Sequence, residues 1–366
     1  MSDFKPGLEG VVAFQTEIAE PDSEGLALRY RGVNIEQIVG HLPYEKVWGL
    51  LVEESIEPGM PDPEPYEPAS LTGNAPSDLQ AETARLSAVW GLKKLVDIDA
   101  DQAGDDLGRL SAQMMSIVAK SAAVHDGRAP APDDVVAQGE TAAEKFLLRW
   151  RGEASPDHVK AVDTYWICTA EHGLNASTFT ARITASTGAD CGAAMSAAVG
   201  ALSGPLHGGA PARVLPMLDE VAETGDPESY VRKILEQHGR IMGFGHRVYR
   251  AEDPRSRILK RTAKELGSPR FEVAEALEEA ALAALHERKP DYVIATNVEF
   301  YSAVVLDVAE VPPDLTPAMF ACARVAGWSA HILEEKRTGR LIRPSAEYVG
   351  PDERPLSELG GAPVAS

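Results

Sequence analysis

The sequence predicts a mainly α-helical protein, with a small β element near its N-terminus. Three observations support this prediction: apolar residues recur at helical spacing, short β-branched stretches precede them, and a proline-rich span interrupts them. The chain has 366 residues, of which 44% are hydrophobic and 25% are charged. This length and composition suit an ordinary globular protein of one large domain or two.

The β element is expected at the start of the chain. Val11, Val12 and Ile18 form one β-branched stretch, and residues 26–35 form another. The turn-forming sequence Pro-Asp-Ser-Glu-Gly at 21–25 separates the two. The pattern therefore predicts a pair of short strands before the helices begin.

Helical periodicity dominates the rest of the chain. Apolar side chains at intervals of three and four residues predict helices with one buried face. We expect two such faces in the core. They consist of Leu107, Leu110, Met114, Ile117 and Ser121, and of Val273, Leu277, Ala281 and Leu285.

A proline-rich span lies between residues 56 and 77, and it predicts a flexible loop. Proline lacks a backbone N–H and its ring clashes with the preceding helical turn, so neither a continuous helix nor a central strand fits there.

A long helix is expected to begin at Thr316-Pro317. The Thr316 hydroxyl would serve as N-cap, and Pro317 would occupy the first turn, where its missing N–H costs nothing. This helix would carry one stripe of side chains that includes a basic residue. Its members are Phe320, Arg324, Trp328 and His331.

The charge balance argues against two classes of partner. The chain has 35 Lys and Arg against 56 Asp and Glu, which gives a formal net charge of −21 at pH 7. Such a charge repels nucleic acid and anionic membranes, so we expect neither as a partner. One cationic patch stands out between residues 240 and 261, around His246. Its basic residues are Arg240, Arg247, Arg250, Arg255, Arg257, Lys260 and Arg261.

The cysteines and the hydropathy pattern indicate the compartment. Cys168, Cys191 and Cys322 are far apart in apolar or small-residue surroundings, so neither a disulfide framework nor a zinc knuckle is indicated. No apolar run reaches the roughly 18 residues of a membrane span, and the start Met-Ser-Asp-Phe lacks the basic beginning of a secretory signal. We therefore expect a cytoplasmic protein.

Two glycine-bracketed segments each hold one histidine. His207 lies in Gly-Pro-Leu-His-Gly-Gly-Ala at 204–210, and His246 lies in Gly-Phe-Gly-His-Arg-Val-Tyr-Arg at 243–250. A third histidine, His172, precedes Gly-Leu-Asn-Ala-Ser-Thr. Glycine permits tight turns and the close approach of a ligand, so these segments predict an active site.

The histidines suit acid–base chemistry better than metal binding. None has the i, i+4 or Cys-x-x-Cys spacing that is typical of a metal site, and Gly-Phe-Gly at 243–245 lacks the third glycine of a dinucleotide fingerprint. Two imidazoles and a carboxylate such as Glu299 can serve as general acid and base without a metal. Arginines grip carboxylates through paired hydrogen bonds. A purely structural role for the histidines stays open.

In these motifs the chain resembles the citrate synthase family, in its short bacterial form. The resemblance implies an acyltransferase that condenses acetyl-CoA with oxaloacetate and hydrolyses citryl-CoA to citrate and CoA, the entry step of the tricarboxylic acid cycle. It implies a homodimer, acetyl-CoA as co-substrate, no tightly bound cofactor and no metal. The segments that carry it are 7–11, 28–33, 171–186, 204–210, 243–255, 297–302, 327–331 and 342–344.

The resemblance also implies a citrate synthase-like division into two domains. Residues 1–208 would form the first part of a large helical domain, which includes the flexible loop 56–77, and residues 313–366 would complete it. Residues 209–312 would form a small domain that closes over the site as a mobile lid.

The resemblance further implies a role for each site residue. Glu299 would remove a proton from the acetyl methyl group, His207 would donate a hydrogen bond to the thioester oxygen, and His246 would protonate the oxaloacetate carbonyl. The residues implied to hold the substrates are His172, Arg255, Arg324 and, from the partner subunit, Arg343 for oxaloacetate, and Arg250 for the coenzyme A phosphates.

One departure from the family pattern concerns Glu299, which stands where aspartate is usual. The extra methylene moves the carboxylate by roughly 1 Å, which can cost on the order of 100-fold in rate if nothing compensates. A shifted backbone around residues 295–297 would compensate. A second departure is the absence of a His-Pro-Met segment from the region between 56 and about 140.

Two other functions stay open at this point. A 2-methylcitrate synthase would use propionyl-CoA through the same residues, and one methylene is worth only ~1 to 3 kcal/mol of discrimination. A non-catalytic relative would bind a dicarboxylate or coenzyme A as a sensor, with the altered acid as a disabled base.

Overall fold

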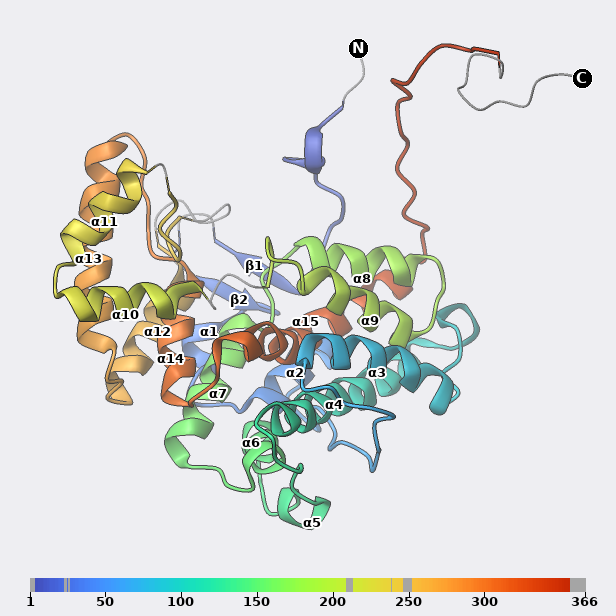
Figure 1. Ribbon diagram of the computed structural model, residues 1–366. Helices are drawn as coiled ribbons and strands as arrows, with labels where there is room; N and C mark the ends of the chain where they lie inside the picture. Colours follow the sequence, from blue (N-terminus) through green and yellow to red (C-terminus); the bar gives the residue numbers. More distant parts are fainter. Residues whose placement is uncertain are drawn as a thin grey trace, which may run out of the picture.

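The computed structural model describes residues 4–22, 25, 27–208, 213–237, 239–245 and 252–355. Figure 1 shows that its helices form a larger and a smaller group. The larger group contains α2 (Tyr44–Glu53), α3 (Ala75–Val89), α4 (Ala100–His125), α5 (Asp133–Val136), α6 (Ala142–Arg151), α7 (Pro156–Thr169), α8 (Ala176–Ser186), α9 (Cys191–Leu202) and α15 (Thr316–Thr338). The smaller group contains α10 (Val214–Thr224), α11 (Pro227–Glu236), α12 (Pro254–Glu265), α13 (Phe271–Arg288) and α14 (Val298–Val308).

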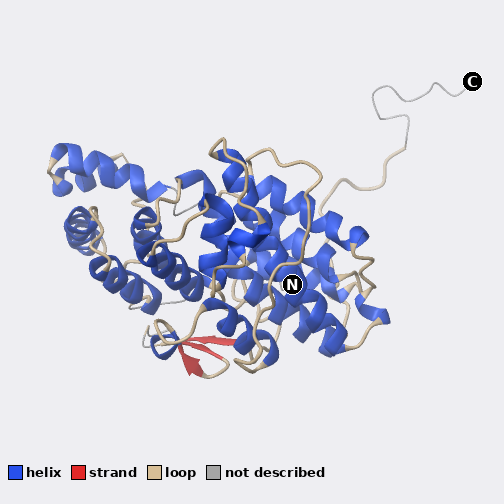
Figure 2. Ribbon diagram, turned by 90° about the horizontal axis from the view of Figure 1, so that it is seen from below, coloured by secondary structure: helices blue, strands red, loops and turns tan. Residues whose placement is uncertain are grey.

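The described strands form one small antiparallel sheet at the edge of the molecule (Figure 2). Because helices make up the rest of the described secondary structure, the predicted mainly α-helical fold class is confirmed. The members of the sheet are β1 (Ala19–Pro21), β2 (Leu28–Tyr30) and β3 (Val33–Asn34), followed by the short helix α1 (Ile35–Ile38).

The sheet differs from the predicted pair of strands in two ways. Val11 and Val12 lie before β1 in a segment without regular secondary structure, and their side chains are exposed. A third strand, β3, joins β2 through a two-residue turn in which Arg31 and Gly32 have positive φ of 47° and 82°. Two positive φ angles in succession give the hairpin turn that matches the strand twist. With only two residues, β3 shows no alternation that a sequence pattern could reveal.

Helix α15 forms the centre of the larger group, where it packs against α2, α4, α7, α8 and α9. Arg324, Trp328 and His331 are at most 2% exposed, so the predicted stripe faces the core. Pro317 lies in the first turn as predicted, but the prediction that Thr316 caps the helix is wrong. The 3-10 turn η4 (Pro313–Leu315) runs directly into α15, so Leu315 occupies the cap position instead.

The proline-rich span contains no helix or strand up to Asn74, but its last three residues belong to α3. The Asn74 side chain caps this helix and Pro76 occupies its first turn, where a proline is tolerated. Buried carboxylates tie the loop to the helices: Glu82 accepts from the Tyr66 hydroxyl and Asp78 accepts from the Thr72 backbone N–H. A 3-10 turn η2 (Leu95–Asp97) and an N-terminal turn η1 (Pro6–Leu8) complete the short elements.

The smaller group is a layer of helices joined to the larger one through α12 and α14, which both pack on α7. Leu277 and Ala281 on α13 are buried, whereas Val273 and Leu285 are partly buried against the core. The α4 face from Leu107 to Ser121 is buried as predicted. In the described part of the chain, no helix is both long and apolar enough to cross a bilayer.

Candidate active site

His207 lies in the turn after α9, and the first turn of α8 holds its ring. Ser177 Oγ lies 2.8 Å from Nε2 of His207, and the Ser177 backbone N–H points at the same nitrogen over 3.4 Å. Trp328 donates its Nε1–H to Ser177 Oγ over 3.1 Å. The Ser177 hydroxyl also donates to Asn175 Oδ1 over 2.9 Å, and the same oxygen accepts the Thr178 N–H. Because the Ser177 backbone N–H can only donate, its direction favours a ring that accepts at Nε2 and carries its proton on Nδ1.

The environment of His207 keeps the ring neutral. Burial and then the Arg324 cation lower the pKa of His207 from 6.5 to about 4. The imidazolium form is therefore scarce near neutral pH. A neutral N–H can donate a hydrogen bond to an oxygen on which negative charge develops, which is how acyl transfer is commonly stabilised.

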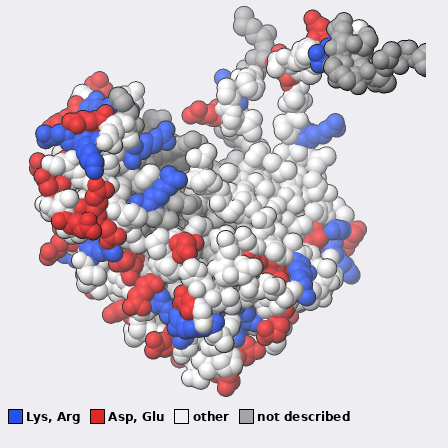
Figure 3. All heavy atoms as spheres, viewed as in Figure 1, with Lys and Arg blue, Asp and Glu red and all other residues white. Residues whose placement is uncertain are grey.

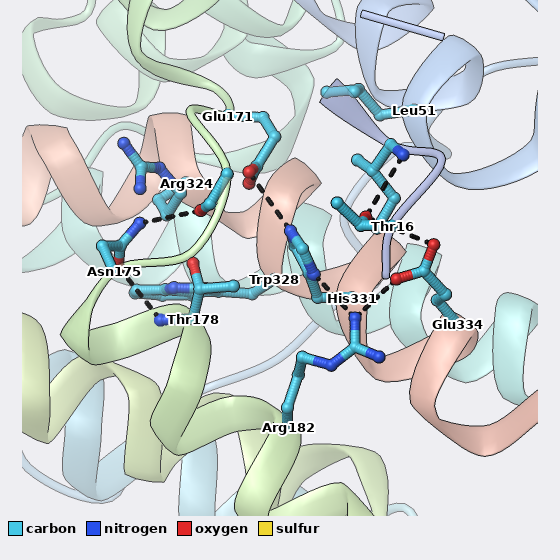
Figure 4. Close-up of polar contacts among 12 residues, drawn as sticks. Thr16, Leu51, Glu171, Asn175, Thr178, Arg182, Arg324, Trp328, His331 and Glu334 are labelled. Atoms are coloured by element: carbon cyan, nitrogen blue, oxygen red, sulfur yellow. Dashed lines mark hydrogen bonds and ion pairs between the residues drawn. The ribbon is translucent and has the colours of Figure 1, made fainter. Parts of the chain in front are cut away.

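Arg324 supplies a buried cation beside this ring. Its guanidinium lies next to the loop between α7 and α8 (Figure 4). The Nε–H donates to the Thr169 carbonyl over 3.0 Å, and the guanidinium carbon lies 4.8 Å from the centre of the Phe320 ring. Arginine stays charged even when buried, so this side chain offers a fixed cationic fork to an anionic ligand.

The Glu171 carboxylate supplies a negative charge near the Arg324 guanidinium. Its Oε1 lies 3.2 Å from Nε2 of His331, and Nδ1 of His331 lies 3.0 Å from Nη1 of Arg182, which also pairs with Glu334 (Figure 4). Burial raises the pKa of Glu171, but His331 and Arg324 outweigh it and hold the pKa below its usual value. Glu171, Arg324, His331 and Arg182, which we call the floor of the site, therefore form a network of charges and hydrogen bonds rather than isolated charges.

Asp253 joins the starts of α12 and α14. Its carboxylate accepts from Nε and Nη2 of Arg255 over 2.9 and 2.8 Å, so the pair is bidentate. The same carboxylate accepts the Val298 backbone N–H over 3.0 Å. Both side chains are nearly fully buried. Asp253 therefore fixes the Arg255 guanidinium relative to the first turn of α14.

Glu299 lies in that first turn. Its backbone N–H donates to Asn297 Oδ1 over 3.0 Å, and Asn297 in turn donates Nδ2–H to the Gly245 carbonyl over 3.0 Å. The side chain is half buried. Burial raises the pKa of the Glu299 carboxyl, Arg255 opposes the rise and Asp253 adds to it. A carboxylate with a raised pKa is a stronger base than an ordinary glutamate.

A cavity of about 500 Å³ opens beside Glu299. Glu299 and Asn297 line one part of it, and the basic side chains Arg240, Arg288 and Lys289 line another. The glycines at 243–245 also line it, although Gly243 is additionally required for packing, because a Cβ there would lie 2.7 Å from Cβ of Phe300. The cavity suits an elongated ligand with an anionic end.

The sequence analysis missed Arg288 and Lys289. They end the apolar pattern of α13, where basic residues are common because they complement the helix dipole. Nothing in the sequence distinguishes that structural role from ligand binding. Only the folded chain shows that the end of α13 meets the segment 243–245 around one cavity.

The structure places His207 near the charge of Arg324, and both Arg324 and Glu299 near the charge of Arg255. After burial, which has the largest effect on each, the pKa of His207 responds to Arg324, while those of Arg324 and Glu299 both respond to Arg255. His172 lies next to Glu171 at the same floor and is half buried.

Of the remaining predicted residues, the structure describes Arg343 alone. Arg343 is exposed on the tail that leaves the body after α15 (Figure 1). His246 and Arg250 lie outside the described residues. Within the described ranges, no group of three or more His, Cys, Asp or Glu residues could hold a metal ion.

A family model matches most of the chain. Residues 7–345 match the model described as citrate synthase, C-terminal domain. A Mycobacterium bovis protein named "Putative citrate synthase 2" is 54% identical over 362 residues, which cover 98% of this chain and 96% of the relative. Citrate synthase 2 of Bacillus subtilis is 35% identical, with 95% of this chain and 96% of the relative covered.

Solved structures agree with this similarity. Citrate synthase from Thermoplasma acidophilum, in a ternary complex with carboxymethyl coenzyme A and oxaloacetate, matches with a TM-score of 0.82 and 28% identity. The match covers 98% of this chain and 100% of that chain. Citrate synthase from Thermotoga maritima matches with a TM-score of 0.74 and 30% identity, over 97% and 99% of the two chains.

Proposed function

The chain belongs to the citrate synthase family, and from this we propose that it condenses acetyl-CoA with oxaloacetate and hydrolyses citryl-CoA to citrate and CoA. The observation that carries the proposal is a buried His207 held by Ser177 together with a Glu299 that lines a cavity. Burial keeps the first neutral and raises the pKa of the second. A methyl group next to a thioester is a very weak acid. A carboxylate can remove its proton only if the charge on the forming enol is stabilised at the same moment.

Proton abstraction and condensation each have a residue assigned to them. Glu299 takes the methyl proton while His207 Nδ1–H donates a hydrogen bond to the thioester oxygen. The enol carbon then attacks the oxaloacetate carbonyl, and His246 gives its proton to the oxygen that becomes the citryl hydroxyl. Water finally attacks the citryl thioester and CoA leaves as the thiol.

Oxaloacetate is held at the floor of the site. Arg324 and Arg255 offer guanidinium groups to its two carboxylates, and His172 adds a third contact. Arg343 of the partner subunit completes the set. The support for this assignment is that Asp253 and the Thr169 carbonyl hold the two guanidinium groups in fixed positions before any ligand arrives.

Coenzyme A occupies the cavity beside Glu299. A thioester whose methyl group meets Glu299 would extend its phosphates toward Arg240, Arg288 and Lys289, which line the same cavity. Arg250 is a further proposed phosphate contact. No tightly bound cofactor is required, because both substrates bring the reacting atoms.

We propose that residues 209–312 form a lid and that the enzyme is a homodimer. The surface above α8 and α9 shows few charged side chains (Figure 3), and the described N-terminal arm and C-terminal tail both extend from this region (Figure 1). Helix α9 has no charged residue, and the single one on α8, Arg182, is buried. A face without charges is typical of the centre of a protein interface.

The buried cysteine thiols support a reducing, cytoplasmic location.

Release of free thiol tests this function directly. The purified protein is given acetyl-CoA or propionyl-CoA, with and without oxaloacetate. We expect thiol release that requires oxaloacetate, with the higher kcat/KM for acetyl-CoA. A higher value for propionyl-CoA would identify a 2-methylcitrate synthase instead. If no thiol is released but oxaloacetate still raises the Tm, the protein is a sensor; at 100 times its Kd a ligand adds about 2.7 kcal/mol.

A further inference from the structure

Glu278, in the middle of α13, makes three side-chain contacts to three separate parts of the small helical group. Its Oε1 accepts from the Thr296 hydroxyl over 2.5 Å, and its Oε2 accepts from the Tyr301 hydroxyl over 2.6 Å. The Lys260 ammonium on α12 lies 2.8 Å from Oε2 and balances the charge. Glu278 is only 8% exposed, so these contacts take the place of water around the carboxylate.

Two of these partners flank Glu299 in the sequence. Thr296 lies three residues before it and Tyr301 lies two residues after it on α14. Thr296 also forms an isolated β-bridge with Phe244, and Gly245 donates its N–H to the Ala295 carbonyl over 2.8 Å. Glu278 therefore holds the chain on both sides of the Glu299 position, in the register that lines the cavity.

We propose that Glu278 is a positioning residue that fixes the first turn of α14, and with it the Glu299 carboxylate, for proton abstraction. This inference rests on the proposed function, since it assigns Glu299 the role of base. Glutamate has one more rotatable bond than aspartate, so its carboxylate is placed accurately only when the backbone that carries it is held firmly. A displacement of about 1 Å at such a base costs up to about 100-fold in rate.

A purely structural role would give a different result. A hydrogen bond that only joins α13 to α14 would lower the free energy of unfolding when lost and leave kcat of the folded enzyme unchanged. A positioning role lowers kcat, leaves oxaloacetate binding unchanged, and makes proton abstraction a larger part of the rate limit. The two roles therefore differ in kinetics and not only in stability.

The partner hydroxyls allow a test that leaves Glu278 in place. Thr296→Val removes the hydroxyl at nearly constant volume, Thr296→Ser keeps it, and Tyr301→Phe removes the second contact. The matched control is Thr262→Val on α12, since Thr262 is also buried and its hydroxyl donates to the Ile258 carbonyl of its own helix. Each variant is assayed for kcat, for the KM of oxaloacetate, and for the isotope effect with methyl-deuterated acetyl-CoA.

We expect kcat to fall about 10-fold in Thr296→Val and in Tyr301→Phe, with the isotope effect increased and the KM of oxaloacetate within about twofold. Thr296→Ser and Thr262→Val should stay within about threefold of wild type in kcat. If Thr296→Val and Tyr301→Phe keep the wild-type kcat and isotope effect while the Tm falls, the positioning role is wrong and the proposed function stands. If wild type itself releases no thiol, the proposed function is the one that fails.

Discussion

Ser177 Oγ lies 2.8 Å from Nε2 of His207 and accepts the Trp328 indole N–H over 3.1 Å. The Ser177 hydroxyl therefore connects the His207 ring, which lies in a turn, to the buried helix α15 and restricts its movement. This contact matters because only the tautomer with its proton on Nδ1 leaves Nε2 free to accept from α8.

Replacing this serine should separate catalysis from stability. In Ser177→Ala we expect kcat to fall on the order of 10-fold, with the KM of oxaloacetate little changed, because the ring loses the hydroxyl that orients it. Ser111→Ala is the matched control, since the buried Ser111 hydroxyl also accepts an indole N–H, from Trp48 over 3.0 Å. The control should lose stability and keep its kcat. Equal kcat values for the two variants would contradict the orienting role.

Shortening the acid should slow the enzyme even though aspartate is the usual family residue. The contacts around Asn297 and Asp253 set the backbone of α14, and they do so with a glutamate at 299. Glu299→Asp withdraws the carboxylate by roughly 1 Å, and we expect kcat to fall between about 10-fold and 100-fold. Steady-state kinetics with saturating oxaloacetate measure this. A faster Glu299→Asp enzyme would mean that the backbone has not adapted to the longer acid.

The depressed pKa of His207 predicts how stability changes with pH. Because the pKa is 6.5 in a free side chain and about 4 in the folded protein, the unfolded chain binds more protons between these values. Wild type should therefore lose stability relative to His207→Asn as the pH falls from 6.5 to about 4. Urea unfolding at several pH values measures the difference. A constant difference across this window would show that the ring is not buried as a neutral group.

Gly327 is predicted to be intolerant of any side chain. A Cβ at this position would lie 2.1 Å from Glu171 Oε2 and 2.6 Å from the Ala170 carbonyl. Gly327→Ala should therefore displace Glu171, raise the KM of oxaloacetate and cost about 1 to 3 kcal/mol of stability. Gly104→Ala on α4 is the control, because a Cβ there meets no atom within 4 Å. That variant should gain up to about 1 kcal/mol. Comparable stability for the two variants would contradict the packing around Glu171.

The sequence predicted those features that periodicity and short motifs encode. The helical core faces, the buried stripe with Arg324 on α15 and the glycine-bracketed His207 all depend on residues close together in the chain. The predictions of the α15 cap and of the number of strands were wrong, because a preceding 3-10 turn and a two-residue strand leave no recognisable sequence pattern.

The supporting residues could not be predicted in the same way. Asp253 reaches Val298, and Glu278 reaches Thr296, across separations that no pattern connects. From the sequence alone, a single acidic residue on a helix cannot be distinguished from one on the solvent-exposed face. Only the fold shows that it is buried and what it contacts. The roles of the predicted site residues came from the family resemblance, and the structure adds the charges and hydrogen bonds that support them.

The most direct test of the account is the turnover of Glu299→Gln. Gln has nearly the shape of Glu but cannot take a proton, so we expect oxaloacetate-dependent thiol release from acetyl-CoA to fall at least about 100-fold, while oxaloacetate still raises the Tm as in wild type. Activity within a few-fold of wild type would contradict the assignment of Glu299 as the base.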